Sequence, residues 1–216
     1  MTWQQLFVYV IGFLAQAFFS GRILYQWIVS EKAKKVMAPP FFWLLSIIGS
    51  YLLFIYGVLR DDFSIILGQL VSYYIYLWNL NIHGIWPKLH KILKFVLIIT
   101  PVVAFGLMLN NLPVYISNFF KNDNIPIWLV VFGSLGQLIF ALRFVYQWLY
   151  SSRKHESLLP IGFWIISLVG SFIIIIYAII RLDPVLIVGQ AFGFVAYSRN
   201  IILGHNHKTN EITNQD

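Results

Sequence analysis

The sequence predicts an all-α membrane protein with seven transmembrane helices, arranged as two parallel three-helix repeats joined by a linker helix. Three observations predict this fold. Hydrophobic residues make up 59% of the 216 residues and charged residues only 11%, whereas soluble domains carry about a quarter charged residues. The chain contains seven apolar runs, each near the roughly 20 residues that a helix needs to cross the hydrocarbon core. The third observation is an internal repeat at a constant offset of 121 residues.

The apolar runs lie near residues 4–29, 41–59, 63–82, 92–110, 126–150, 161–180 and 184–203. Lys94 and Pro101 shorten the clean apolar stretch of the fourth run. The first run is expected to be a span and not a cleaved signal peptide, because it lacks a basic n-region and its equivalent recurs in mid-chain. The predicted units are a first repeat over 1–83, a linker with the fourth helix over 84–125, a second repeat over 126–204 and a polar tail over 205–216.

The internal repeat aligns residues 13–81 with 134–202 without a gap, and 23 of the 69 aligned positions are identical. Most identities fall on Gln, Arg, Tyr, Trp, Ser, Gly, Asp and Asn, so the likeness reflects duplication and not shared apolar composition. Each copy holds three spans, and the single linker span lets both copies face the same way. Parallel repeats of this kind commonly enclose a substrate path at their interface.

The positive charges predict how the chain lies in the membrane. One side carries Lys32, Lys34, Lys35, Lys88, Lys91, Lys94, Arg153, Lys154, Lys208 and, near a helix end, Arg199; the other carries Arg60, Lys121 and Arg181. Loops rich in Lys and Arg stay cytoplasmic, so we expect a multi-pass protein of the bacterial inner (plasma) membrane, with a periplasmic N-terminus and a cytoplasmic C-terminus. The net charge of +7 is then a topology signal, which predicts membrane lipids as partners and no nucleic acid.

The strongest functional candidates are Arg22 and Arg143, which occupy equivalent positions roughly 8–12 Å below the cytoplasmic interface at 1.5 Å per helical residue. A charge at that depth costs a few kcal/mol on insertion scales and is usually paired or functional. Every Asp and Glu lies in a loop or tail, so no intramembrane carboxylate is expected to pair with them. The guanidiniums either snorkel to the interface or bond carbonyls and Gln side chains, or together meet an anion such as phosphate.

Further polar residues lie close to the two arginines in the sequence. Tyr25 and Gln26 follow Arg22 by three and four positions, which predicts one shared helix face, and the second copy repeats this arrangement. The predicted substrate-binding residues are Arg22, Arg143, Gln26, Gln147, Tyr25, Tyr146, Asn79, Asn200, Gln69 and Gln190. For Gln69 and Gln190, hydrogen bonding that simply holds helices together is the favoured alternative.

The third helix of the first copy carries a polar stripe that the second copy keeps only in part. Ser72 and Tyr73 are replaced there by Gly193 and Phe194. This asymmetry suggests that the two halves no longer do the same job.

Other repeated residues have structural interpretations. The tryptophans Trp27, Trp43, Trp148 and Trp164 lie near predicted cytoplasmic helix ends, where most Trp residues are interfacial anchors. Small residues at close-packing spacing are Gly49, Ser50, Gly170 and Ser171, with Ser46 and Ser167 one turn earlier. Arg60-x-Asp62 and Arg181-x-Asp183 predict surface turns, with Asp183 as a helix N-cap before Pro184.

Enzyme chemistry is not expected. The chain has no cysteine, and its histidines (His83, His90, His155, His205 and His207) all fall in predicted loops or the tail. No Ser-His-Asp or paired-carboxylate arrangement lies in a predicted span. We therefore predict no catalytic residues, no metal site and no cofactor, with His205 and His207 a weak metal signal only.

The residue motifs resemble those of known families. The layout of three, one and three helices resembles the SWEET and PQ-loop transporters. The pattern Gln16-x5-Arg22-x2-Tyr25-Gln26-Trp27, repeated from Gln137 to Trp148, with Gly68-Gln69 in the third helix, more specifically resembles the lipid-A-disaccharide synthase N-terminal-like (LAB_N) domain family. This resemblance implies a component of glycolipid or lipid A modification systems, and the glycosyltransferase activity in the family's name is not carried over to this sequence. The first helix lacks the Pro-Gln hinge of SWEET transporters, and Pro39 and Pro160 lie before the second helices instead.

Three functions follow as hypotheses. The first is a flippase-like inner-membrane translocator or binding protein for a phosphate-bearing glycolipid such as a polyprenyl-phosphate sugar, serving lipid A or envelope glycan modification. The second is a SWEET-like facilitator of free sugar, with little dependence on Arg22 or Arg143. The third is a membrane subunit that docks a glycosyltransferase through cytoplasmic loops around 30–40, 83–94 and 151–158.

Overall fold

The computed structural model describes residues 3–59, 63–120, 126–180, 182 and 184–213, and all secondary structure in these ranges is helical. The helices are α1 (Trp3–Ala33), α2 (Pro40–Leu59), α3 (Phe63–Ile82), the short 3₁₀ helix η1 (Trp86–Lys88), α4 (Lys91–Asn110), α5 (Leu112–Phe120), α6 (Ile127–Lys154), α7 (Ile161–Ile180) and α8 (Pro184–Thr213). The predicted all-α class is confirmed for these residues.

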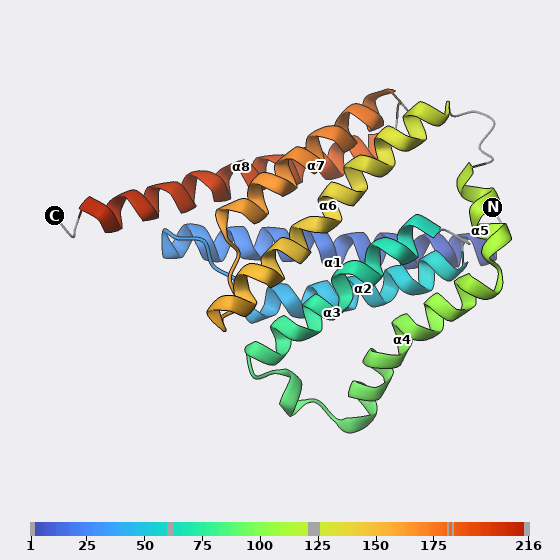
Figure 1. Cartoon of the computed structure of the whole chain (residues 1–216), viewed down its shortest axis with the longest axis horizontal. Coiled ribbons are helices and arrows are strands. Elements are labelled where there is room, and N and C mark those ends of the chain that lie inside the picture. Colours follow the sequence, from blue (N-terminus) through green and yellow to red (C-terminus); the bar gives the residue numbers. More distant parts are fainter. Residues whose placement is uncertain (1–2, 60–62, 121–125, 181, 183, 214–216) are drawn as a thin grey trace.

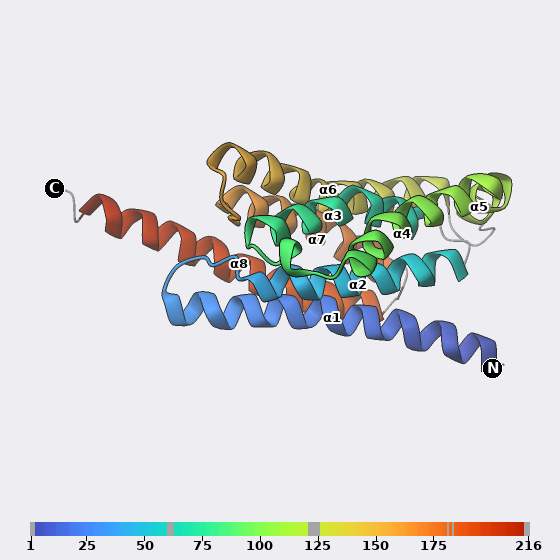
Figure 2. The ribbon, with the colours of Figure 1, turned by 90° about the horizontal axis from the view of Figure 1, so that it is seen from below.

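The helices form two triads that point the same way. α1, α3, α6 and α8 run from right to left in Figure 1, while α2, α4 and α7 run in the opposite direction. Within each triad the middle helix, α2 or α7, packs against both neighbours. The triads meet along two seams, α3 against α6 and α1 against α8 (Figures 1 and 2). Each seam joins the first helix of one repeat to the third helix of the other, so the six helices close a pseudo-twofold ring.

Five helical segments among the described residues are long and apolar enough to cross a membrane. They are Leu6–Ala33, Pro40–Leu59, Lys91–Asn110, Ile127–Lys154 and Ile161–Ile180. The chain is thus a membrane protein by composition and helix length, while the count of seven spans stays a prediction. The sequence of α3 shows why it falls outside this group: Gln69, Ser72 and Asn79 interrupt its apolar residues, and the ring covers this polar side.

Helix boundaries agree with the predicted runs in places and differ in others. α7 and α3 match the predicted runs at both ends. The predicted tail over 205–216 instead continues α8 as helix to Thr213, and this end projects beyond the bundle in Figures 1 and 2. α5 was not expected as a separate helix inside the predicted linker. The two Arg-x-Asp turns and the Asp183 cap fall on or beside residues outside the described ranges.

Glycines at equivalent positions bring the first two helices of each repeat into close contact. A Cβ atom added to Gly12 would lie 2.8 Å from the ring of Tyr56, and one added to Gly133 would lie 2.7 Å from the ring of Tyr177. The predicted close packing at Gly49 and Gly170 is also seen, because Gly49 lies against the ring of Phe19 on α1 and Gly170 lies against the backbone of Phe140 on α6. The repeat therefore conserves the helix contacts within each triad.

The linker helix α4 explains part of the asymmetry between the repeats. α4 packs on α2 and α3, so it covers the first repeat. Tyr73 donates a hydrogen bond from its hydroxyl to the Leu97 carbonyl of α4 at 2.9 Å. The second repeat places Phe194, which has no hydroxyl, at the equivalent position. The difference at Tyr73 thus has a packing cause, and a division of labour between the halves is not required to account for it.

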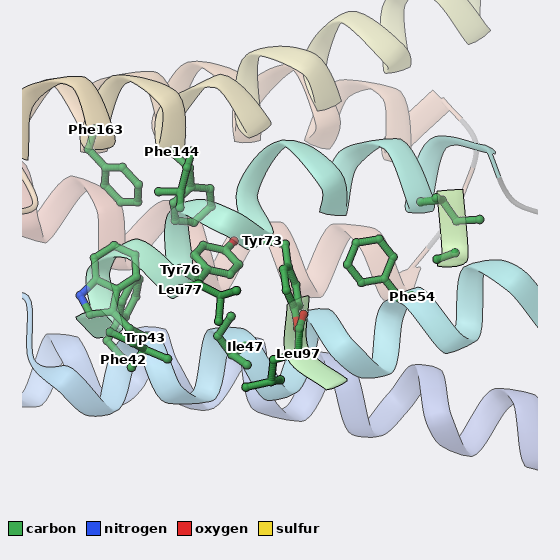
Figure 3. Close-up of a cluster of buried hydrophobic side chains, with 14 of the residues drawn as sticks. Phe42, Trp43, Ile47, Phe54, Tyr73, Tyr76, Leu77, Leu97, Phe144 and Phe163 are labelled. Atoms are coloured by element: carbon green, nitrogen blue, oxygen red, sulfur yellow. The ribbon is translucent and has the colours of Figure 1, made fainter. Parts of the chain in front are cut away.

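Aromatic side chains of both repeats fill the centre of the ring. Figure 3 shows Phe144 and Phe163, from α6 and α7, pointing toward Trp43, Phe42 and Tyr76 of the first repeat. The interpretation of Trp43 as an interfacial anchor is wrong, and so is that of its equivalent Trp164, because their side chains are 0% and 1% exposed. Both indoles lie in the core because α2 and α7 turn them inward, toward the aromatic cluster.

Candidate anion site between the repeats

Arg22 and Arg143 lie inside the ring, on α1 and α6. Each is only 4% exposed, so neither guanidinium snorkels to the membrane interface. Their inward position follows from helix geometry, since Arg22 and the buried Gln26 are four residues apart and so lie one above the other on the same face. The second repeat places Arg143 and Gln147 in the same way. The sequence thus brings one buried cation from each repeat into the interior.

Aromatic rings surround the Arg22 guanidinium. Its central carbon lies 4.5 Å from the centre of the Phe19 ring, 5.3 Å from that of Phe42 and 5.5 Å from that of Tyr76. Phe19 can occupy this place because Gly49 leaves room for it: an added Cβ would lie 3.1 Å from the Phe19 ring. Cation–π contacts of this kind return part of the hydration energy that a buried guanidinium loses.

The Arg143 guanidinium has the equivalent surroundings. It lies 3.3 Å from the centre of the Phe140 ring, 5.6 Å from that of Phe163 and 5.8 Å from that of Tyr197. Gly170 makes the room here, because an added Cβ would meet the Phe140 backbone nitrogen at 2.9 Å. The repeated glycines of α2 and α7 therefore let Phe19 and Phe140 approach closely, Gly49 through the Phe19 ring and Gly170 through the Phe140 backbone.

The two arginines donate hydrogen bonds to different hydroxyl groups, although both repeats contain the same two candidates. Arg22 Nη1 donates to the Ser46 hydroxyl at 2.8 Å, whereas Arg143 Nη1 donates to the Tyr197 hydroxyl at 3.4 Å. Each repeat contains both options, because Ser167 is the equivalent of Ser46 and Tyr76 the equivalent of Tyr197. The nearly symmetric site thus holds its two cations in two different arrangements.

No carboxylate among the described side chains balances these charges. The described acidic side chains are Glu31, which pairs with Arg199, and the exposed Glu156 in the α6–α7 loop. The sequence has no Asp or Glu over 3–30, 40–59, 63–82, 127–154, 161–180 and 184–210. The Nε atoms of Arg22 and Arg143 are buried without a hydrogen-bond partner, and so are the indole nitrogens of Trp43 and Trp164.

The two cations also share one aromatic neighbour, Phe144. Phe144 lies 5.3 Å from the Arg22 guanidinium and 4.7 Å from that of Arg143, so the two charged groups are at most about 10 Å apart. Two unit charges within that distance repel each other by at least about 1.7 kcal/mol at an effective dielectric constant near 20. Burial without a counter-ion adds several kcal/mol per charge. An anion bound between them would relieve both costs.

Little space lies between the arginines. A cavity of about 10 Å³ lies there, lined by residues of α1, α2, α6, α7 and α8 that include Arg22, Arg143, Trp164 and Tyr197. This is about the volume that one water molecule needs. A phosphate group is larger than this space, so its binding requires the side chains or helices around the cavity to move apart.

One helical turn from the arginines, about 6 Å along α1 and α6, two buried amide pairs cross the seams. At the α1–α8 seam, Gln26 Nε2 donates to Asn200 Oδ1 at 2.8 Å, and Asn200 Nδ2 donates to Gln26 Oε1 at 3.1 Å. At the α3–α6 seam, Gln147 Nε2 donates to Asn79 Oδ1 at 3.0 Å, and Asn79 Nδ2 donates to Gln147 Oε1 at 3.1 Å. All four side chains are 0% exposed.

Two serines that support these amides are not among the predicted site residues. Ser30 Oγ accepts from the Gln26 amide at 2.9 Å and from the Met37 backbone at 3.0 Å. Ser151 does the same in the second repeat, for Gln147 and Leu158. The identity of Ser30 and Ser151 in the internal alignment was the available signal. These contacts fix the loop after the first helix of each repeat.

A further serine breaks the symmetry of the two seams. Ser157 Oγ donates to Asn79 Oδ1 at 2.7 Å, which gives this oxygen a second donor. The first repeat has Val36 at the equivalent position, so Asn200 Oδ1 has no such second contact among the described side chains.

Four predicted site residues do not reach the two arginines. Tyr25 and Tyr146 are each 37% exposed and lie on the outer surface of the ring. The prediction that they share a face with the arginines is wrong, because neighbouring helical residues point about 100° apart and Gln26 and Gln147 take the inward direction. Gln69 accepts from Ser50, and the Gln190 carbonyl accepts from Ser171 at 3.3 Å. Ten residues separate each of these glutamines from Asn79 or Asn200, about 15 Å of helix.

Comparison with known proteins identifies two copies of one family domain in this chain. The family described as Lipid A Biosynthesis N-terminal domain matches residues 11–81 and residues 132–202. Curated relatives named lipid-A-disaccharide synthase are 32% identical over 91% of the chain in Chlamydia pneumoniae and 28% identical over 91% in Chlamydia felis. The chain spans about a third of these relatives, 33% of each. No solved structure matches it.

Proposed function

Since the chain belongs to the Lipid A Biosynthesis N-terminal domain family, with one copy in each repeat, we propose that it binds and translocates a phosphate-bearing glycolipid such as a polyprenyl-phosphate sugar. The process it serves is lipid A or envelope glycan modification. One observation carries the proposal: two buried guanidiniums, one from each repeat, lie at most about 10 Å apart with no carboxylate among the described side chains to balance them. A guanidinium binds phosphate, like carboxylate, through two parallel charge-assisted hydrogen bonds, so phosphate suits this site.

The arrangement suggests how such a lipid is held. Arg22 and Arg143 contact the phosphate, and the adjacent amide pairs offer donors and acceptors to sugar hydroxyls once the seams part. The acyl or prenyl chain stays in the surrounding lipid and passes through a seam between the repeats. No closed aqueous channel is needed for this path, which accords with the small cavity. Consumption of the lipid on the receiving side drives the movement, and the chain itself acts as a carrier and not as an enzyme.

The orientation in this proposal rests on the positive loops. The C-terminal ends of α1, α3 and α6 lie at the same end of the bundle in Figure 1, and the basic residues Lys34, Lys88 and Arg153 fall at or just after these ends. We place this end in the cytoplasm of a bacterium, with the protein in the inner membrane and its N-terminus in the periplasm. The arginines then open toward the cytoplasmic leaflet, where the glycolipid is loaded.

Flipping of a polyprenyl-phosphate sugar in proteoliposomes tests the proposal. Arg22→Met and Arg143→Met remove one buried charge each while keeping apolar volume, a change that proteins often tolerate without loss of stability. Arg153→Ala is the matched control, because it removes a positive charge from the exposed end of α6. We expect each Met variant to lose most of its flipping while the control retains it. Flipping that persists in both Met variants would overturn the phosphate site, and uptake of free sugar with no lipid flipping would favour the facilitator.

A second candidate function is favoured by the lengths of the relatives. The matched region is about a third of proteins named lipid-A-disaccharide synthase, so in those chains the domain is joined to about twice its own length of further sequence. The present chain would then dock a glycosyltransferase at the membrane through its loops around 30–40, 83–94 and 151–158. Co-purification of a glycosyltransferase with the tagged chain, lost on exchange of these loops for Gly-Ser linkers, is the expected result. Absence of flipping together with intact co-purification would establish this function instead of transport.

A further inference from the structure

We infer that the site between Arg22 and Arg143 selects a terminal phosphate monoester, which carries two negative charges, over a phosphodiester, which carries one. This inference rests on the proposed function and narrows its substrate class. It assigns the preferred glycolipid as one that ends in a free phosphoryl group. A lipid whose phosphate bridges two alcohols, including the polyprenyl-phosphate sugar given above as an example, is then a weaker ligand of the same site, and a glycolipid with a terminal phosphate is the preferred one.

The charge count is the first argument. Each repeat contributes one guanidinium, and both are 4% exposed. The helices that form the ring carry acidic residues only near their C-terminal ends: Glu31 on α1, which already pairs with Arg199, and Glu211 on α8. A phosphate monoester carries about −1.5 to −2 charges at neutral pH and so neutralises both cations. A diester leaves one guanidinium buried and unbalanced, which is the costly case for an ion in a protein interior.

The unused hydrogen-bond donors are the second argument. Arg22 Nε and Arg143 Nε are buried without partners, and each Nη1 is held by a single neutral hydroxyl. The indole N–H groups of Trp43 and Trp164 are also unpartnered. A terminal phosphate offers three strong acceptor oxygens, whereas a diester offers two. The donors come from both repeats, so a ligand with three free oxygens can be held from the two sides at once.

The small cavity is the third argument. With about 10 Å³ between the cations, any phosphate must separate the aromatic rings that now occupy the space. That movement gives up the cation–π contacts at Phe19 and Phe140. A ligand must therefore bind each guanidinium more favourably than these rings do. A doubly charged phosphate can make an ionic contact with both arginines, whereas a singly charged phosphate can balance the charge of only one.

The experiment compares two lipids with identical acyl chains. The purified full chain in neutral detergent is titrated with dioleoyl phosphatidic acid, a monoester, and with dioleoyl phosphatidylglycerol, a diester, and binding is followed by the midpoint of thermal unfolding. Phosphatidic acid is expected to bind at least roughly tenfold tighter, since one additional charge-assisted hydrogen bond typically gives that much. Inorganic phosphate is titrated in parallel. Equal stabilisation by inorganic phosphate would assign the site to the free ion and overturn the lipid part of the inference.

The pH dependence separates this inference from general attraction to anionic lipid. The second proton of a phosphate monoester leaves near pH 6, so binding of phosphatidic acid should strengthen between about pH 5.5 and pH 8, while that of phosphatidylglycerol stays flat. Arg22→Met and Arg143→Met should each abolish the difference between the two lipids, and Arg153→Ala should keep it. Equal binding of both lipids through the arginines would overturn the monoester preference and leave the proposed function standing. Binding of neither lipid, or binding that ignores both arginines, would overturn the two together.

Discussion

The two seams of the ring should differ in stability because their amide pairs have different support. We predict that Gln26→Met destabilises the fold more than Gln147→Met does. Both substitutions remove a reciprocal amide pair of the same geometry and leave a side chain of similar length. After Gln147→Met, the oxygen of Asn79 still accepts from Ser157, and the Leu158 carbonyl still accepts from Ser151. After Gln26→Met, the oxygen of Asn200 has no remaining donor among the described contacts.

The expected difference can be worked from these contacts. Leaving one fully buried acceptor without a partner costs about 1–3 kcal/mol in proteins, and hydrogen bonds between transmembrane helices lie toward the lower end. We therefore expect Gln26→Met to lose about 1–2 kcal/mol more than Gln147→Met. For a chain of this size, 1 kcal/mol shifts the midpoint of thermal unfolding by roughly 2–4 °C, so the two variants should differ by about 2–8 °C.

Thermal unfolding in a mild detergent, followed by circular dichroism, measures the difference. The control uses the residue that distinguishes the repeats: Ser157→Val installs the residue type found at Val36. In the Gln147→Met background it should lower the midpoint toward that of Gln26→Met, because Asn79 then loses its second donor. The reasoning is refuted if Gln147→Met is as destabilising as Gln26→Met, or if Ser157→Val has no further effect in that background.

Two further predictions concern packing and pH. Gly170→Ala should destabilise the fold by about 1–3 kcal/mol in thermal unfolding, and more than Gly49→Ala. The new methyl group of Gly170→Ala meets the Phe140 backbone at 2.9 Å, whereas that of Gly49→Ala meets only the Phe19 ring at 3.1 Å, so equal losses would contradict this account. Burial lowers the pKa of His83, which follows α3, while a backbone hydrogen bond with Ala38 partly raises it. The unfolded chain then binds the proton more readily, so stability should fall as pH drops below about 6.5, and His83→Gln should reduce this dependence in unfolding midpoints measured from about pH 7.5 to 5.5.

The helices could be predicted from sequence because apolar length and the internal repeat are both local signals. The predicted run over 161–180 and α7 coincide, for example. The direction in which each side chain points is harder to predict from sequence. Lipid and protein core are equally apolar, so periodicity cannot distinguish the lipid-facing side of a helix from the core-facing side. The sequence therefore predicts an interfacial anchor at Trp43, which is fully buried, and a shared face for Tyr25 and Arg22, although Tyr25 lies on the outer surface.

The candidate site was partly visible in the sequence for a related reason. A charge repeated at one position of a membrane helix indicates an inward face, and Arg22 and Arg143 follow that rule. Their neighbours could not be paired in advance, because the partner of Gln26 lies 174 residues away on α8. The sequence showed that Gln26 and Asn200 are each repeated, but a contact between them depends on how the two triads meet. Only the ring geometry supplies that information.

The ring described above is tethered unevenly. At the α3–α6 seam, the intervening segment with α4 and α5 limits how far the two helices can separate, and α4 also packs on α3. At the α1–α8 seam, 150 residues lie between the facing helices (34–183), and the polar contacts of Gln26 with Asn200 and of Glu31 with Arg199 join a ring contact between Trp27 and Phe192. The two triads should therefore separate at the α1–α8 seam while they stay together at the α3–α6 seam. A lipid that reaches the buried arginines from the side would then enter between α1 and α8.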